Sequence, residues 1–195
     1  GSYYKMSREK VLCGKEEIFR VAIGIVDSDG MEALSVRNIA KELGVSPMTI
    51  YNYVENLNDI KKRVLINGFD RMYSTVYAKL SDLHAPVDKM LFCKTIAMSV
   101  YRFASENRGV FIFMFSDGER LFSEDAEVRP FYNNIQKLMK RAKATKKDWT
   151  INEKGYRLFE ILIFSVSYQF AAGTKSLSEE EYGELIDYYL TRCIS

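Results

Sequence analysis

Apolar residues recur every three or four positions along most of the chain, which is the spacing of helices that bury one face. Alternation of the strand type, bounded by the dipeptides that form hairpin turns, is not found in the sequence. The pattern therefore predicts an all-α fold. The expected helices cover residues 8–27, 36–43, 47–54, 57–81, 86–107, 110–115, 130–143, 151–172 and 179–193, with a polar, acidic loop at residues 116–127.

Residues that favour helix ends mark several of these boundaries. Ser35 and Ser46 each precede a short helix, where a side-chain oxygen accepts a hydrogen bond from a free N–H group. Gly44 suits the left-handed conformation that ends a helix, and Pro47 suits the first position of the next one. Capping boxes are expected at Thr150 with Glu153 and at Ser178 with Glu181.

The two short helices form a predicted helix-turn-helix with an unusual outer surface. On a helical wheel of the second helix, the inward positions are Ile50, Tyr53, Val54 and Leu57. The outward positions are Met48, Tyr51 and Asn52, with Thr49 at the flank. Large side chains that form hydrogen bonds therefore face away from the core, which indicates a binding surface.

The first third of the chain carries an ordered set of apolar, glycine and polar positions. They are Ile18-Phe19, Ala22, Gly30, Leu34-Ser35-Val36-Arg37, Ile39-Ala40, Leu43-Gly44-Val45-Ser46, Thr49-Ile50-Tyr51 and Tyr53-Val54. This set resembles the N-terminal DNA-binding domain of the tetracycline-repressor (TetR) family. Ala40 lets the two helices cross closely, Gly44 takes the positive backbone torsion of the turn, and Ile50 fills the core between the helices.

The resemblance implies that the second helix docks in the major groove of DNA while neighbouring residues hold phosphates. It assigns phosphate or thymine-methyl contacts to Thr49 and Tyr51, an adenine edge to Asn52, and apolar contacts to Pro47 and Met48. The whole DNA-contacting set expected on this basis is Ser35, Arg37, Ser46, Pro47, Met48, Thr49, Tyr51, Asn52, Tyr53 and Lys61.

The sequence departs from the family pattern just after the recognition helix. Leu57 occupies the position where a phosphate-contacting lysine commonly begins the fourth helix. Two replacements stay open, a cation further along that helix or the basic N-terminal arm. The candidates are Lys61, Lys62 and Arg63 in the first case, and Lys5, Arg8 and Lys10 in the second. Glu55 would repel phosphates, so we expect the recognition helix to end by Val54.

We expect two domains, residues 1–56 for DNA binding and residues 57–195 for dimerisation and ligand binding, with Gly1-Ser2 as a remnant of an expression tag. The last two helices carry more apolar surface than one face needs. By resemblance they pair with their copies as a four-helix bundle; alternatively, they complete the core of the monomer. The expected interface residues are Phe159, Leu162, Ile163, Val166, Leu185, Tyr188 and Tyr189.

Methionine and aromatic residues in the second domain are typical of adaptable apolar pockets, although such residues also build ordinary cores. They favour a small-molecule effector that is hydrophobic or aromatic. The expected ligand contacts are Met90, Met98, Tyr101, Phe111, Met114, Tyr132 and Tyr168.

Composition narrows the remaining function classes. The net charge is only +2, so DNA binding has to be local. A basic cluster at residues 137–147 is better explained as a solvated face than as a second nucleic-acid surface. Three scattered cysteines and the single His84 favour reduced thiols and no metal site. The apolar stretch 158–170 is too short for a bilayer, and no secretory signal is found, so we expect a cytoplasmic protein without a membrane partner.

The combined hypothesis is a ligand-responsive transcriptional regulator, expected to be a repressor. It would bind a pseudo-palindromic operator in double-stranded DNA as a homodimer, and a small-molecule effector would release it. An enzyme is not expected, because the sequence offers no nucleophile with a base, no phosphate-binding glycine loop and no metal cluster, and no cofactor is expected. The alternative is a helical protein-protein interaction module with a vestigial helix-turn-helix.

Overall fold

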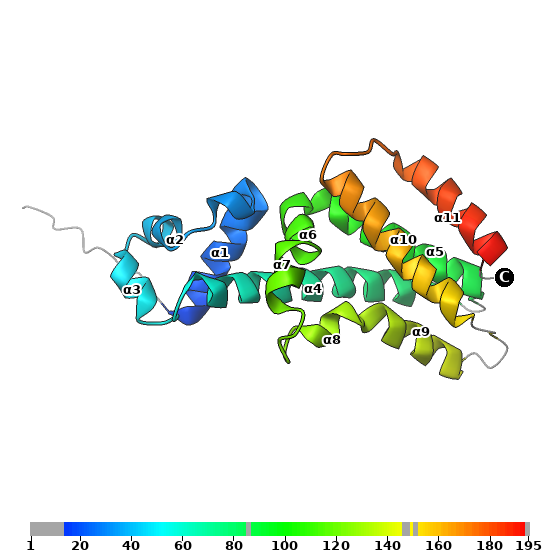
Figure 1. Cartoon of the computed structure of the whole chain (residues 1–195), viewed down its shortest axis with the longest axis horizontal. Coiled ribbons are helices and arrows are strands. Elements are labelled where there is room, and N and C mark those ends of the chain that lie inside the picture. The colour runs from blue at the N-terminus through cyan, green and yellow to red at the C-terminus, as the bar shows by residue number, and fades with distance from the viewer. Residues whose placement is uncertain (1–13, 85–86, 146–148, 150–151, 194–195) are drawn as a thin grey trace, which may run out of the picture. The chain divides into compact units, whose positions relative to one another are not determined.

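The structure is a computed structural model, which describes residues 14–84, 87–145, 149 and 152–193. All regular secondary structure in these residues is helical, which confirms the all-α prediction. The chain forms two compact units, residues 1–64 and residues 65–195, and the division lies within the long helix α4 (Leu57–Ser81). The two units are drawn in Figure 1 and are described separately below.

The N-terminal unit is built on a small apolar core. It contains α1 (Lys15–Asp29), the 3-10 helix η1 (Met31–Ala33), α2 (Val36–Leu43), α3 (Pro47–Tyr51) and the first residues of α4. α1 packs against η1 and α2, and α2 packs against α3. The side chains at its centre are fully buried: Ile18, Ala22, Ile39, Ile50 and Ile60. Because α1, α2, α3 and α4 all contribute side chains to this core, the core holds the short α3 in place.

In its described residues, the C-terminal unit contains the rest of α4 and seven further helices. These are α5 (Lys89–Glu106), α6 (Arg108–Met114), α7 (Asp117–Phe122), α8 (Arg129–Tyr132), α9 (Asn134–Thr145), α10 (Glu153–Ala171) and α11 (Glu179–Cys193). α5 packs against both α10 and α11, and α10 also packs against α6 (Figure 1). No helix in the described residues is long and apolar enough to cross a membrane.

Aromatic packing around Phe69 of α4 organises the centre of this unit. The Phe69 ring is fully buried and lies 4.7 Å from the ring of Tyr132 and 5.5 Å from that of Phe131, measured between centroids. Phe115 lies 5.9 Å from Phe69 and 4.5 Å from Phe164 of α10. Such edge-on and offset ring pairs add stability beyond the area they bury, so α4, α8 and α10 are joined by one cluster of rings.

α10 and α11 approach closely near the start of α10. A Cβ atom added to Gly155 would lie 2.8 Å from the backbone oxygen of Cys193, so only glycine fits here without a shift. The Tyr189 hydroxyl donates a hydrogen bond of 2.6 Å to the Gly155 carbonyl. The capping box predicted at Ser178 and Glu181 is confirmed, because each backbone N–H donates to the other side chain.

Several expected boundaries were wrong. Residues 116–127 were expected to be a loop, but α7 forms there. Asp117 and Glu119 lie in its first turn, where negative charge favours a helix, so the acidic composition was misleading. The helix expected at 130–143 is divided into α8 and α9 at Asn133, where Phe131 and Tyr132 pack on Phe69. This tertiary packing has no signature in the helical periodicity.

Two helix starts also differ from those expected. α10 begins at Glu153, and Asn152 caps it by accepting a hydrogen bond of 3.2 Å from the Gly155 N–H, whereas Thr150 lies outside the described residues. α5 is capped by Asp88, which accepts from the Leu91 N–H at 2.7 Å. Pro86, the expected start, also lies outside the described residues. Aspartate and asparagine satisfy free N–H groups as well as serine does.

Gly118 of α7 is expected to be essential for packing. A Cβ atom there would lie 2.6 Å from the backbone oxygen of Phe113 and 2.9 Å from a methyl carbon of Leu65. Gly118→Ala should therefore lower the free energy of unfolding by about 1 to 3 kcal/mol, measured by urea titration with circular dichroism.

Gly183 of α11 provides the matched control in the same unit. A Cβ atom at Gly183 would make only an ordinary contact of 3.8 Å with the Met98 sulfur. Gly183→Ala should therefore raise the free energy of unfolding by about 0.5 to 1 kcal/mol, because alanine is the better helix former. Equal stability of the two variants would contradict the packing assigned to Gly118.

Candidate DNA-binding surface and effector pocket

The turn between α2 and α3 has the geometry expected of a helix-turn-helix. The Ser35 hydroxyl caps α2 by accepting a hydrogen bond of 3.1 Å from the Asn38 N–H. At the other end, Gly44 adopts the left-handed conformation with φ at +66°. The Val45 N–H donates back to the Ala40 carbonyl at 3.0 Å. The predicted roles of Ser35 as a cap and of Gly44 in the turn are confirmed.

α3 is held at its start by a cap and at its inner face by the core. The Ser46 hydroxyl accepts a hydrogen bond of 3.2 Å from the Thr49 N–H, and Pro47 takes the first helical position. On the inner face, Ile50 is fully buried and Val54, just after the helix, is almost fully buried. The outer face of α3 is therefore presented at a fixed orientation within the N-terminal unit.

The outer face of α3 exposes large apolar and polar side chains. Met48 is 71% exposed, Tyr51 is 48% exposed and Tyr53 is 41% exposed. Among the described residues of the N-terminal unit, large apolar side chains with this exposure occur at these three positions alone. Asn52 is exposed between the tyrosines, while Thr49 is half-buried, with its hydroxyl 3.0 Å from that of Ser46. Clustered exposed apolar groups of this kind mark interaction surfaces.

The recognition helix is shorter than the sequence pattern indicates. It ends at Tyr51, and the N–H groups of Tyr53 and Val54 both donate to the Ile50 carbonyl in a turn. Tyr53 was expected to face the core but is exposed, because the helical wheel no longer applies after Tyr51. The expectation that Glu55 lies outside this helix is confirmed; its N–H donates to Asp59 at 2.8 Å.

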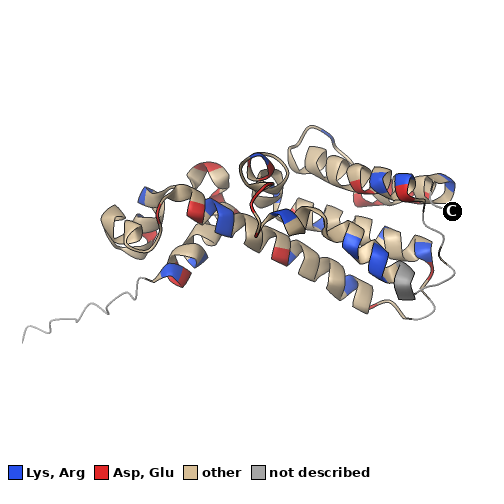
Figure 2. Cartoon of the chain, turned by 60° about the horizontal axis from the view of Figure 1, so that its bottom comes forward, with Lys and Arg blue, Asp and Glu red and all other residues tan. Residues whose placement is uncertain are grey.

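Positive charge near α3 is sparse. Acidic and basic residues are interspersed in both units (Figure 2), in keeping with the low net charge. Arg37, in the first turn of α2, is exposed, and Lys61 of α4 is half-buried. The Arg63 guanidinium lies 5.8 Å from the centre of the Phe19 ring, a cation-π contact within the unit. The basic arm that includes Lys5, Arg8 and Lys10 lies outside the described residues.

Leu57, the position that departs from the family pattern, is the first residue of α4. The side chain of Asn56 caps this helix by accepting a hydrogen bond of 2.8 Å from the Asn58 N–H. Leu57 itself is half-buried. Position 57 therefore offers apolar surface in place of a cation.

The expected interface residues of α10 and α11 fall into two groups. Phe159 and Ile163 are fully buried within the chain, where the Phe159 ring stacks on that of Tyr189 at 6.1 Å. Leu185 and Tyr188, in contrast, are 54% and 61% exposed. Leu162, Val166 and Tyr189 are half-buried. Sequence reasoning missed Leu158 and Ile161 of α10, which are also more than half exposed, because amphipathic periodicity does not separate an inner face from an interface.

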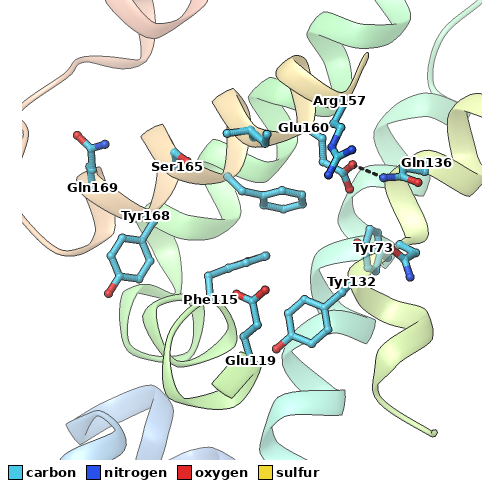
Figure 3. Close-up of a pocket in the computed structure, with 13 residues that line it drawn as sticks. Tyr73, Phe115, Glu119, Tyr132, Gln136, Arg157, Glu160, Ser165, Tyr168 and Gln169 are labelled. Carbon is cyan, nitrogen blue, oxygen red and sulfur yellow. Dashed lines mark hydrogen bonds between the residues drawn. The ribbon is translucent and has the colours of Figure 1, made fainter. Parts of the chain in front are cut away.

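A cavity of about 660 Å³ lies within the C-terminal unit, between α4, α7, α8, α9 and α10 (Figure 3). Two of the expected ligand residues, Tyr132 and Tyr168, line it. Its lining residues are Tyr73, Phe115, Glu119, Tyr132, Asn133, Gln136, Arg157, Glu160, Ile161, Phe164, Ser165, Tyr168 and Gln169. Sequence reasoning missed most of this set, because its members come from five helices.

The other expected ligand residues do not line this cavity. Phe111 and Met114 are fully buried, and Tyr101 is almost fully buried, with its ring stacked on that of Tyr182 at 4.5 Å. The Tyr101 hydroxyl also donates a hydrogen bond to the Leu177 carbonyl. Met90 and Met98 are half-buried on α5. These side chains fill the core around α5 and α6.

Glu160 is a half-buried carboxylate in the cavity wall. It accepts a hydrogen bond of 3.1 Å from the Gln136 side chain, drawn as a dashed line in Figure 3. Burial raises the pKa of Glu160, which the Gln136 hydrogen bond and the charge of Arg157 only partly offset. In the sequence, Glu160 was visible only as one of the polar residues that interrupt the apolar stretch 158–170. A carboxylate in such a run is a signal for a polar cavity.

The described residues contain no group of three or more histidine, cysteine, aspartate or glutamate side chains that could hold a metal ion. Cys93 is buried, and burial raises the pKa of its thiol to about 12, which disfavours the reactive thiolate. Cys193 is an exposed free thiol, and Cys13 lies outside the described residues.

Comparisons with known proteins match both units. The profile described as "Bacterial regulatory proteins, tetR family" matches residues 15–55, from the start of α1 to the turn before α4. An uncharacterized HTH-type transcriptional regulator of Mycobacterium tuberculosis is 30% identical over 66 residues, which are 34% of this chain and 27% of that protein.

Similar solved structures extend over almost the whole chain. A protein of unknown function from Rhodococcus sp. RHA1 is similar with a TM-score of 0.76 at 14% identity, over 98% of this chain and 100% of the other. The fatty acid degradation regulator FadR from Bacillus halodurans has a TM-score of 0.68 at 15% identity, over 90% of this chain and 93% of the other. At such identities the likeness concerns the fold, while the match at residues 15–55 concerns the helix-turn-helix. Residues 15–55 thus match the DNA-binding region of the tetR family of bacterial regulatory proteins, and the chain as a whole has the fold of these solved structures.

Proposed function

We propose that this chain binds an operator as a homodimer through the outer face of α3 and acts as a repressor that a small molecule releases. The observation that carries the proposal is the exposed surface of Met48 and Tyr51 on α3 and of Asn52 and Tyr53 in the turn after it, where Ile50 anchors the inner face. A rigid element that presents large side chains with hydrogen-bonding groups suits the major groove.

The contacts divide into two kinds. Tyr51 and Asn52 are placed to read base edges, since both side chains are exposed at the end of α3 and carry hydrogen-bonding groups. Arg37, at the start of α2, and Lys61, near the start of α4, are the proposed phosphate contacts. Ser35 and Ser46 contribute by capping the helices that carry these residues, because both hydroxyl oxygens accept backbone hydrogen bonds.

Homodimerisation is supported by the unpaired apolar surface of α10 and α11. Leu158, Ile161, Leu185 and Tyr188 are each more than half exposed in the single chain, which favours a protein partner. A second copy is the partner that operator binding requires, because two recognition helices must enter successive major grooves. Effector binding in the cavity of the C-terminal unit would then shift the dimer between two states of different operator affinity.

The reading surface is tested by the double variant Tyr51→Ala/Asn52→Ala. Operator fragments are first recovered by retention of genomic DNA on the purified wild-type protein, and affinity is then measured by fluorescence anisotropy. Each lost base contact should reduce binding by roughly 1 to 3 kcal/mol. Wild-type binding should also weaken steeply as salt concentration rises. Protein binding releases cations that are condensed on the DNA phosphates, and this release is less favourable when the salt concentration is high.

Tyr77→Ala is the matched control, because Tyr77 of α4 is a similarly exposed tyrosine in the other unit. It should leave operator affinity unchanged. Unchanged affinity in the Tyr51→Ala/Asn52→Ala variant would overturn the assignment of this surface. Binding of another protein in place of DNA, with little salt dependence, would favour an interaction module.

The dimer surface is tested by Leu185→Glu, which places a charge on the exposed apolar face of α11. A carboxylate buried against a second copy without a partner should raise the dimer dissociation constant by about tenfold or more, measured by analytical ultracentrifugation. Leu121→Glu on α7, also an exposed leucine, should leave the dissociation constant unchanged. If the Leu185→Glu variant forms a dimer as stable as that of the wild type, the exposed face of α11 is not the dimer interface.

A further inference from the structure

The cavity of the C-terminal unit carries more negative than positive charge. Glu119 of α7 and Glu160 of α10 line it, while Arg157 is the one basic residue in the lining (Figure 3). Glu160 is half-buried, whereas Arg157 is exposed at the rim. A ligand within the cavity therefore meets a carboxylate in the less solvated position, where a charge interacts most strongly.

The Glu160 carboxylate lacks a cation as its direct partner among the described residues. Its hydrogen bond comes from the neutral Gln136 amide, and Arg157 contributes only a weaker attraction than that bond. Arg157 lies beside Glu160, but it is exposed and offsets the burial of the carboxylate only partly. A positively charged ligand would therefore still be attracted to Glu160, whereas an anionic ligand would be repelled.

Two tyrosines of the wall present acceptors. The Tyr73 hydroxyl donates its proton to the Phe131 carbonyl at 2.8 Å, and the Tyr132 hydroxyl donates to the Met114 carbonyl at 2.7 Å. A hydroxyl has one proton, so each of these oxygens can offer only lone pairs to a ligand. These groups add to the two carboxylates as acceptors, and they favour a ligand that donates hydrogen bonds.

Aromatic rings line the rest of the cavity, some of them on the same helix as Glu160. Figure 3 shows Phe115 and Tyr132 near Glu119, with Tyr168 on the other side, and Phe115 and Phe164 lie 4.5 Å apart between ring centres. Ring faces attract both flat apolar groups and cations, most strongly when water is excluded. The apolar part of a ligand would lie against these rings while its charged end points to Glu160.

A second cavity, of about 560 Å³, limits where the charged end can lie. It shares Gln136, Arg157 and Glu160 with the first cavity and lies between α9 and α10. Its lining includes Lys140 and Lys154 in addition to Arg157, so cations outnumber the carboxylates of Glu153 and Glu160 there. A cationic ligand is therefore favoured on the aromatic side of Glu160 and disfavoured on the lysine side.

We propose that the effector of this regulator is an organic cation, a protonated amine carried on an aromatic or flat apolar body, with the Glu160 carboxylate as its counter-ion. This inference rests on the proposed effector-controlled function and names the class of ligand. It extends the expectation from the sequence, which favoured a hydrophobic or aromatic effector and made no statement about its charge. The aromatic body is retained, and the positive charge is new.

The test uses three naphthalene probes that differ in one substituent: 2-naphthylmethylammonium, 2-naphthylmethanol and 2-naphthylacetate. Binding to the full chain at neutral pH is measured by isothermal titration calorimetry. The ammonium probe should bind about tenfold more tightly than the alcohol, the gain expected of a partly buried charge pair, and the acetate should bind most weakly. Tightest binding of the acetate, or no preference for the ammonium probe, would overturn the proposal.

Two variants locate the charge that matters. Glu160→Gln should reduce the preference for the ammonium probe over the alcohol to about twofold or less, because the counter-ion is lost while the hydrogen-bonding shape is kept. Glu153→Gln is the matched control, since Glu153 lies on the same helix but lines only the second cavity. A preference that survives Glu160→Gln, or that disappears in Glu153→Gln, contradicts the assigned site.

The Glu160→Gln variant should be at least as stable as the wild type at neutral pH. The groups that face Glu160 are Tyr73, Tyr132 and Glu119 from other helices, with Gln136 and Arg157 beside it. Because burial raises its pKa, the folded state holds the proton more tightly than the unfolded state. The free energy of unfolding therefore falls as pH rises from the ordinary carboxyl pKa through the raised one. Glutamine does not titrate, so the Glu160→Gln variant should lack this pH-dependent loss of stability. Thermal unfolding of both proteins at several pH values measures the difference.

DNA retention separates failure of this inference from failure of the proposed function. If the wild-type protein retains operator DNA but does not prefer the ammonium probe, the ligand class is wrong and the regulator function stands. If the protein prefers the ammonium probe through Glu160 but retains no DNA, the assignment of the cation site is supported and the proposed operator binding is wrong. If both hold, adding the ammonium probe should lower operator affinity for the wild type and much less for Glu160→Gln.

Discussion

The burial of Ile50 is the interaction on which the orientation of α3 and of its exposed outer face depends. α3 has only five residues, and a helix of that length has no stability of its own in water. Its start is satisfied by Ser46, and its inner face is held because Ile50 is fully enclosed by the core of the N-terminal unit. Met48 and Tyr51 can therefore stay exposed on the outer face, because Ile50 supplies the buried contact of this helix.

The C-terminal unit differs from the N-terminal unit because it contains both a packed core and a cavity. The rings around Phe69 join α4, α8 and α10, and the same rings continue into the wall of the cavity. The Glu160 carboxylate in this wall is partly removed from water, and this burial raises its pKa. A group that is unfavourable for folding and lies in a cavity is a candidate for binding.

Local signals in the sequence were reliable where local chemistry decides the structure. Ser35, Ser46 and the Ser178–Glu181 pair cap the helices they were predicted to cap, and Gly44 ends α2 with a positive φ. The errors occur where packing decides. Tyr53 lies in the turn after α3, where helical periodicity no longer describes its orientation. The expected helix 130–143 is divided into α8 and α9 where the rings of Phe131 and Tyr132 pack on Phe69.

The sequence by itself determined the all-α class, the helix-turn-helix and the residues at its outer face, because periodicity, caps and turn residues act over a few positions. Only the tertiary structure decided which apolar residues of α10 stay exposed, and which side chains share a cavity. Phe159 and Leu158 are neighbours of similar hydrophobicity, yet one is fully buried and the other is exposed. Burial and cavity lining depend on contacts between helices distant in the chain, and no local pattern records those contacts.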